Sequence, residues 1–176
     1  MSAGAAPRVG LRPLGPADRN AFLAAARRSR GLHRPWSYPP QDADAYTAYT
    51  EPDATRFPLG VFRLDDDELC GSFSISQIFY GPFRSAYLGY YAFVPHAGQG
   101  YMRDGLRLVL RFAFDDLGLH RLQASIQPAN ERSIALVRGA GFRREGLSRR
   151  YLKIGGRWRD HEHWAILAED ARGPAT

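Results

Sequence analysis

The stretch that decides the fold reads LGYYAFVPHAGQGYM and occupies residues 88–102. Its first half belongs to a nearly apolar strand that we predict over Ala86–Val94, and Pro95–Gly100 forms the turn that follows. From Tyr101 to Leu117 apolar residues recur at steps of three and four, which predicts an amphipathic helix. The glycines of the turn therefore lie where a strand leads into a helix.

The Gly98-Gln99-Gly100 sequence at this junction is typical of an anion site. Glycine lets backbone N–H groups approach a ligand closely, and a helix N-terminus adds partial positive charge. A dinucleotide-binding fingerprint needs a third glycine where the chain has Arg103, and a P-loop needs a lysine where it has Tyr101. Both of these sites are excluded, which leaves another phosphate ligand or a plain turn.

The segments on either side of this junction predict a mixed sheet with helices on its faces. A first strand and helix are expected over Arg8–Pro13 and Pro16–Arg30, and a later loop contains a short helix at Ala43–Thr50. The four carboxylates at residues 65–68 join two apolar strands, which favours a hairpin turn over a metal or acid–base site. The other predicted elements are strands at Phe57–Leu64, Leu69–Phe79, His120–Gln127, Phe142–Ile154 and His161–Leu167, and a helix from Asn130 to Gly139.

The composition indicates one soluble globular domain. The chain has 176 residues, 44% of them hydrophobic, and no apolar run approaches the roughly 18 residues of a membrane-spanning helix. A single cysteine, Cys70, excludes an internal disulfide, and residues 1–7 lack an apolar signal core, so we expect a cytoplasmic protein. The net charge of +6 rests on arginine, because Lys153 is the only lysine. The basic residues between Arg138 and Arg159 favour an anionic cofactor, an acidic partner or a solvated face.

Two segments resemble the signatures of the GNAT acyltransferase superfamily. Residues 88–102 are similar to its acetyl-CoA motif, and Asn130–Leu136 with Gly139–Phe142 are similar to its second signature. Within the superfamily the chain most resembles the RimJ and RimL type, which acetylate the N-termini of ribosomal proteins. That likeness rests on the pair Ser29-Arg30, on Pro35-Trp36, and on the run Gly155-Gly156-Arg157-Trp158-Arg159-Asp160-His161.

The resemblance implies a single α/β (α+β) domain over residues 8–168, with short flexible tails at 1–7 and 169–176. It implies a mixed, mostly antiparallel sheet of six to seven strands, splayed in the middle and flanked by about four helices. The splay is expected between the Ala86–Val94 strand and the strand that begins at His120, where it opens a wedge.

The resemblance also implies acetyl-CoA as cosubstrate, without a metal. The pantetheine arm is expected along the backbone of Phe93 and Val94, and Asn130 and Ser133 are expected beside the thioester. Asparagine is also a good helix cap, so Asn130 has a capping role, a cofactor contact or both. The N–H groups expected to hold the pyrophosphate are those of Gly98, Gln99, Gly100, Tyr101 and Met102.

The implied reaction is direct attack of a primary amine on the thioester. Many relatives place a tyrosine where this chain has Val137, so we choose Ser133 to protonate the leaving thiolate. No residue is identified as the general base. Trp36, Tyr38 and Tyr91 are the candidates for the acceptor site, with core packing as the alternative.

The favoured acceptor is the α-amino group of a ribosomal or other protein N-terminus. A small amine (an antibiotic, a polyamine or an amino acid) is the alternative, and so is a catalytically weak acyl-CoA-binding module. Nucleic-acid binding ranks last, because the basic residues cluster late in the chain and most aromatics lie in strands. We expect no membrane partner and a monomer or homodimer. His161 and His163 share a strand face, but two ligands without a third make a poor metal site.

Overall fold

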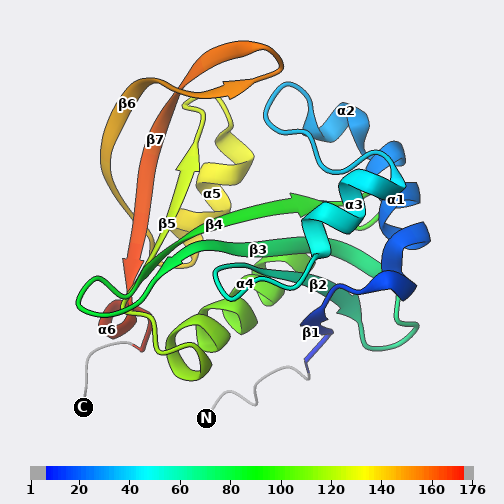
Figure 1. Ribbon diagram of the computed structural model, residues 1–176, viewed down its shortest axis with the longest axis horizontal. Helices are drawn as coiled ribbons and strands as arrows, with labels where there is room; N and C mark the ends of the chain where they lie inside the picture. The colour runs from blue at the N-terminus through cyan, green and yellow to red at the C-terminus, as the bar shows by residue number, and fades with distance from the viewer. Residues whose placement is uncertain (1–6, 173–176) are drawn as a thin grey trace.

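The computed structural model describes residues 7–172, which form a twisted seven-stranded sheet with helices on both faces (Figure 1). The strand order is β1-β2-β3-β4-β5-β7-β6, and all neighbouring strands are antiparallel except β4 and β5. The predicted mixed, mostly antiparallel sheet is thereby confirmed. The strands are β1 (Val9–Pro13), β2 (Phe57–Arg63), β3 (Leu69–Phe79), β4 (Ser85–Ala92), β5 (Arg121–Ile126), β6 (Arg143–Ile154) and β7 (Arg157–Leu167).

Six α-helices lie within the described residues, more than the predicted four. They are α1 (Arg19–Arg28), α2 (Arg30–His33), α3 (Ala43–Thr50), α4 (Tyr101–Arg111), α5 (Glu131–Gly139) and α6 (Ala168–Arg172).

Two local features explain the difference. The predicted helix over residues 16–30 is divided at Ser29, which leaves helical geometry and accepts a hydrogen bond from the end of the β4 segment. The segment Ala168–Arg172, part of which was predicted as a tail, is the helix α6. The rest of the predicted tails, at 1–6 and 173–176, lies outside the described residues.

Helices cover the two faces of the sheet over different strands. On one face, Leu106 and Val109 of α4 are fully buried in one core with Phe73 of β3. Gly105 lets the helix approach closely, since a Cβ there would lie 2.7 Å from a methyl carbon of Val61. On the other face, a second core that includes Phe22 packs α1 and α3 against the sheet.

The sheet is splayed between β4 and β5. These two strands pair only at Ser85, Ala86 and Tyr87, opposite Arg121, Leu122 and Gln123. Beyond this point the strands separate, as the arrows of β4 and β5 in Figure 1 show. The expected wedge is therefore present, and the edge of β4 that faces it has no strand partner after Tyr87.

The acidic segment at residues 65–68 is the β2–β3 turn, as predicted. Arg63 donates from Nε to Asp65 at 2.9 Å, and the pKa of Asp65 falls to about 2 because of this bond. Glu68 contacts the Nε2 atom of the buried His96 at 2.8 Å, which ties the hairpin to the glycine turn. Within the described part of the chain no helix is long and apolar enough to cross a membrane.

Candidate active site

The glycine turn has the backbone geometry that an anion site requires. Gly98 and Gly100 have φ angles of 82° and 86°, in the left-handed region that glycine adopts without strain. Gly100 is the N-cap residue of α4 and has no side chain with which to cap the first turn. The first N–H groups of α4 are therefore left for a ligand, and the helix dipole favours a negatively charged one.

Two guanidinium groups lie beside this turn. A Cβ placed on Gly100 would lie 3.0 Å from Nη2 of Arg8 and 3.3 Å from Nη2 of Arg103. Arg8 also donates to the backbone oxygen of Gln99 at 3.3 Å and, through Nε, to Asp104 at 2.8 Å. Arg8 was not predicted at this site, because only the packing of the β1 segment against α4 brings it here. The basic residues between Arg138 and Arg159 lie mainly on β6, at the opposite edge of the sheet from β1.

The first turn of α4 packs on β3 at Gly71, where the strand has no side chain. A Cβ at Gly71 would lie 2.3 Å from Sδ of Met102 and 2.6 Å from the backbone oxygen of Tyr91. The Met102 side chain therefore packs directly on the backbone of Gly71. The position of the glycine turn, which leads into α4, depends on this contact.

Replacing Gly71 with alanine is expected to destabilise the protein by about 1–3 kcal/mol, because the added methyl overpacks the Met102 contact. It should also weaken acetyl-CoA binding, since α4 must shift to relieve the clash. Thermal denaturation and calorimetric titration measure the two effects. Gly146→Ala on β6 is the matched control, because a Cβ there has no atom within 4 Å. Equal stability of the two variants would contradict the prediction.

The backbone at the end of β4 is partly engaged. The N–H of Phe93 donates to the oxygen of Cys70 at 2.9 Å, and the N–H of Val94 donates to Oγ of Ser29 at 2.9 Å. Both N–H groups expected along the pantetheine arm therefore have protein partners. Alternation along an antiparallel strand instead places the N–H groups of Tyr90 and Ala92 on the edge that faces the wedge.

A pair of hydroxyl groups spans the wedge between β4 and α5. The Oη atom of Tyr90 lies 2.5 Å from Oγ of Ser133, and burial raises the pKa of Tyr90. Asn130 caps α5, because its Oδ1 accepts the N–H of Ser133 at 3.3 Å. Its contact with a cofactor stays a prediction. Val137 is fully buried in the core.

Tyr90, which was not among the predicted site residues, is a further candidate because of its contact with Ser133. The available signal was the alternation of β4, in which Tyr90 and Tyr91 point to opposite faces. Tyr91 points to the face of α1 and α3, with its ring 5.7 Å from that of His33. Tyr90 points to the face of α4, with its ring 5.6 Å from that of Phe73.

The three predicted acceptor residues are not gathered in one pocket. Tyr91 lines a cavity of about 440 Å³ on the sheet, whereas Tyr38 lines one of about 260 Å³ beside α2. His33 links the two regions, because it lines the second cavity and contacts Tyr91. Trp36 lines neither, and its backbone oxygen accepts Nε2 of Gln127 at 3.1 Å. Their role in acceptor binding stays a prediction.

The buried His33 is held neutral. Its Nε2 donates to the oxygen of Ala92 at 2.7 Å, and only 5% of the residue is exposed. Burial lowers the pKa of His33, and it lowers that of His161 in the same way. Both histidines thus favour the folded state only while they are unprotonated.

Acidification is therefore expected to reduce stability before most carboxylates titrate. The unfolded histidine titrates near its usual pKa of 6.5 and the folded one at a lower pH. The stabilisation is complete above 6.5 and is lost as the pH falls through the lower folded value. Melting temperatures between about pH 7.5 and pH 5.5 measure the loss, and His33→Gln should reduce it. An identical pH dependence in wild type and variant would contradict this role.

The two strand histidines contact protein groups through their ring nitrogens. His163 contacts Oγ of Ser148 through Nε2 at 2.7 Å and Oγ of Ser125 through Nδ1 at 3.1 Å. His161 Nδ1 contacts the backbone oxygen of Arg159. Across residues 7–172 no three His, Cys, Asp or Glu side chains are grouped so that they could hold a metal ion.

An open wedge beside a glycine turn at a helix start is the arrangement in which a CoA thioester would fit. The family model of the acetyltransferase (GNAT) domain matches residues 8–143. The chain belongs to the GNAT acetyltransferase family. It is accordingly an acetyl-CoA-dependent N-acetyltransferase, as the sequence resemblance implied.

Two curated relatives illustrate the range of similarity. The probable N-acetyltransferase YjcK of Bacillus subtilis is 40% identical over 114 residues, which are 65% of this chain and 63% of that protein. The chain thus spans less than two thirds of that relative. The [ribosomal protein uS5]-alanine N-acetyltransferase of Escherichia coli is 29% identical and covers 87% of this chain and 85% of its own length.

Solved structures with the same fold contain CoA. RimJ of Mycobacterium smegmatis in complex with CoA-disulfide has a TM-score of 0.80 and 30% identity, and the match covers 93% of this chain and 85% of that one. Spermidine N-acetyltransferase of Vibrio cholerae in complex with CoA and spermine also has a TM-score of 0.80, at 20% identity, covering 94% and 99%. The second likeness shows the fold alone. The RimJ match, together with the family, supports binding of acetyl-CoA by this chain.

Proposed function

We propose that this enzyme acetylates the α-amino group of a protein N-terminus, with a ribosomal protein as the first candidate. The observation that carries the proposal is the similarity to the uS5-alanine acetyltransferase over 87% of the chain, together with the RimJ likeness at 30% identity. The free, buried Cys70 suits the reducing cytoplasm, where ribosomal proteins and acetyl-CoA are found.

We assign the donor site to the glycine turn and the wedge. The N–H groups of Gly98, Gly100, Tyr101 and Met102, together with the Arg8 and Arg103 guanidinium groups, would hold the pyrophosphate. The predicted N–H of Gln99 is instead engaged, because it donates to the backbone oxygen of His96 at 3.3 Å. The pantetheine arm would run along the wedge-facing edge of β4, whose backbone has no strand partner after Tyr87. Tyr90 of this strand contacts Ser133 through its hydroxyl, and the thioester would lie beside this pair.

Acetyl transfer from the thioester to an α-amino group does not require a strong general acid or base in the protein. An α-amino group has a pKa of roughly 7.7–8.0, so a large fraction is neutral at physiological pH and water can take the proton. The amine nitrogen forms a bond to the carbonyl carbon, and the C–S bond then breaks. The thiolate, with a pKa of about 8.5, takes a proton from Ser133, and Tyr90 can resupply that proton through their 2.5 Å contact. The proton that the amine gives to water then restores the hydroxyl pair, so no charged side chain remains.

An acceptor screen tests the proposal. Release of free CoA thiol would be measured with N-terminal peptides beginning in alanine or serine, and with spermidine, an aminoglycoside and free amino acids. We expect the highest kcat/KM for a peptide. Transfer to a small amine with none to any peptide would overturn the acceptor assignment and leave the enzyme class unchanged.

A further inference from the structure

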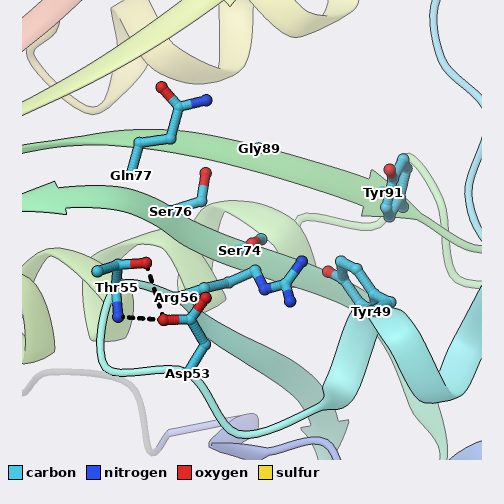
Figure 2. Close-up of a pocket in the computed structure, with 9 residues that line it drawn as sticks. All are labelled: Tyr49, Asp53, Thr55, Arg56, Ser74, Ser76, Gln77, Gly89 and Tyr91. Carbon is cyan, nitrogen blue, oxygen red and sulfur yellow. Dashed lines mark hydrogen bonds between the residues drawn. The ribbon is translucent and has the colours of Figure 1, made fainter.

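The larger cavity lies on the sheet face that also carries α1 and α3, on the opposite face from α4. At about 440 Å³ it falls within the size range of small-ligand sites. Figure 2 shows Ser74 and Ser76 of β3 and Gly89 and Tyr91 of β4 along its floor, with Tyr49 and Arg56 on one side. Its remaining lining residues are Asp53, Thr55 and Gln77. Gly89 and Tyr91 of this lining belong to the part of β4 that has no β5 partner and borders the wedge.

Arg56 brings a guanidinium group to the lining of this cavity. Its Nη2 donates to the backbone oxygen of Ala48 at 3.1 Å. Its Nε atom is buried and has no hydrogen-bond partner in the part of the chain that the structure describes. The guanidinium carries several N–H donors and a positive charge, so the cavity suits a ligand that brings acceptor oxygens.

The charge of the cavity does not suit a polycation. Asp53 is the one carboxylate in its lining, and its Oδ1 already accepts the N–H and the hydroxyl of Thr55, both at 2.8 Å. Arg56 is the one cationic side chain in the lining. A ligand with several ammonium groups would meet one guanidinium and one carboxylate, so the lining offers it no net negative charge.

Gly89 keeps the floor of the cavity open. A Cβ there would have no atom within 4 Å, and the backbone is not in the left-handed region. Neither packing nor backbone conformation therefore calls for glycine at this position. The neighbouring residues on the same face of β4, Tyr87 and Tyr91, carry large side chains. The missing side chain leaves room for a ligand above the strand.

We propose that this cavity binds the peptide segment behind the reacting amine and selects peptide acceptors over polyamines, an inference that rests on the proposed function. The amine passes Tyr91 into the wedge, and the following carbonyl oxygens accept from Arg56 and from the hydroxyls of Ser74 and Ser76. A peptide carries a carbonyl acceptor in every residue, whereas a polyamine has none and adds positive charge beside Arg56.

A side chain added at Gly89, on the floor of the cavity, tests whether the peptide binds there. In Gly89→Val, kcat/KM for an alanine tripeptide should fall at least about tenfold, as expected for loss of well-positioned binding. The affinity for acetyl-CoA, measured by calorimetry, should not change. Gly146→Val is the matched control, because it adds the same side chain to an open strand position on β6. Unchanged peptide kinetics in Gly89→Val would overturn the location.

Reversing the charge of Arg56 tests whether this residue selects peptides over polyamines. Arg56→Glu should lower kcat/KM for the tripeptide and raise it for spermidine, so that their ratio falls by about a hundredfold. A loss of stability alone would lower both values together and leave the ratio unchanged, and that result would overturn the role of Arg56.

Direct binding separates this proposal from the proposed function. Calorimetry with CoA present should show that the tripeptide binds to wild type and not to Gly89→Val. Binding of this kind without acetyl transfer would contradict the proposed function and support the cavity. Transfer to the peptide that is insensitive to both substitutions would contradict the cavity and support the function.

Discussion

Replacing Gly100 with valine is expected to weaken acetyl-CoA binding at least about a hundredfold, the largest single effect on the donor side. The φ angle of 86° strains any β-branched residue at this position. The new Cβ would also lie 3.0 Å from the Arg8 guanidinium and close the surface on which the pyrophosphate is expected. Calorimetric titration with acetyl-CoA measures the loss.

Backbone strain alone must be separated from loss of the anion site. Gly81→Val provides the comparison, because Gly81 has a φ of 70° with open space around it and lies in the β3–β4 turn. Both variants should lose stability, but only Gly100→Val should lose cofactor affinity. If the two bind acetyl-CoA equally well, the pyrophosphate does not sit at Gly100.

Much of the donor side could be predicted because its signals are local. The strand, the glycines and the helix start follow one another within residues 88–102, so their joint geometry depends little on the rest of the chain. The helix at Ala43–Thr50 was found at the observed boundaries for the same reason, since Asp42 caps it through its own side chain.

The missed features depend on packing between distant segments. Arg8 reaches Gln99 across 91 positions of sequence, and no local pattern records that contact. Ser29 interrupts a helix because its hydroxyl accepts the N–H of Val94, 65 positions away. Strand alternation predicts that Tyr90 and Tyr91 point to opposite faces of the sheet. The sequence does not indicate which of these faces carries α5, so the contact of Tyr90 with Ser133 could not be predicted. The cavity beside Arg56 likewise needs β3, β4 and the 53–56 loop together.

Removing the Ser133 hydroxyl is expected to have the largest effect on the chemical step. Ser133→Ala should lower kcat about a hundredfold, within the range for loss of a positioned acid, and leave the affinity for acetyl-CoA unchanged. Tyr90→Phe should lower kcat by about tenfold, because Ser133 keeps its own proton and loses only the group that resupplies it. Single-turnover measurements with a saturating peptide would isolate this step.

The double variant Tyr90→Phe/Ser133→Ala decides whether the two hydroxyls act as one relay. If Tyr90 acts only through Ser133, the double variant should be no slower than Ser133→Ala alone. Tyr46→Phe is the matched control, because Tyr46 is also buried and donates to the backbone oxygen of Gly15 at 2.8 Å, away from the wedge. It should lower the melting temperature and leave kcat unchanged. Multiplicative losses in the double variant would show that Tyr90 acts independently of Ser133, and an unchanged kcat in Ser133→Ala would remove the serine from the mechanism.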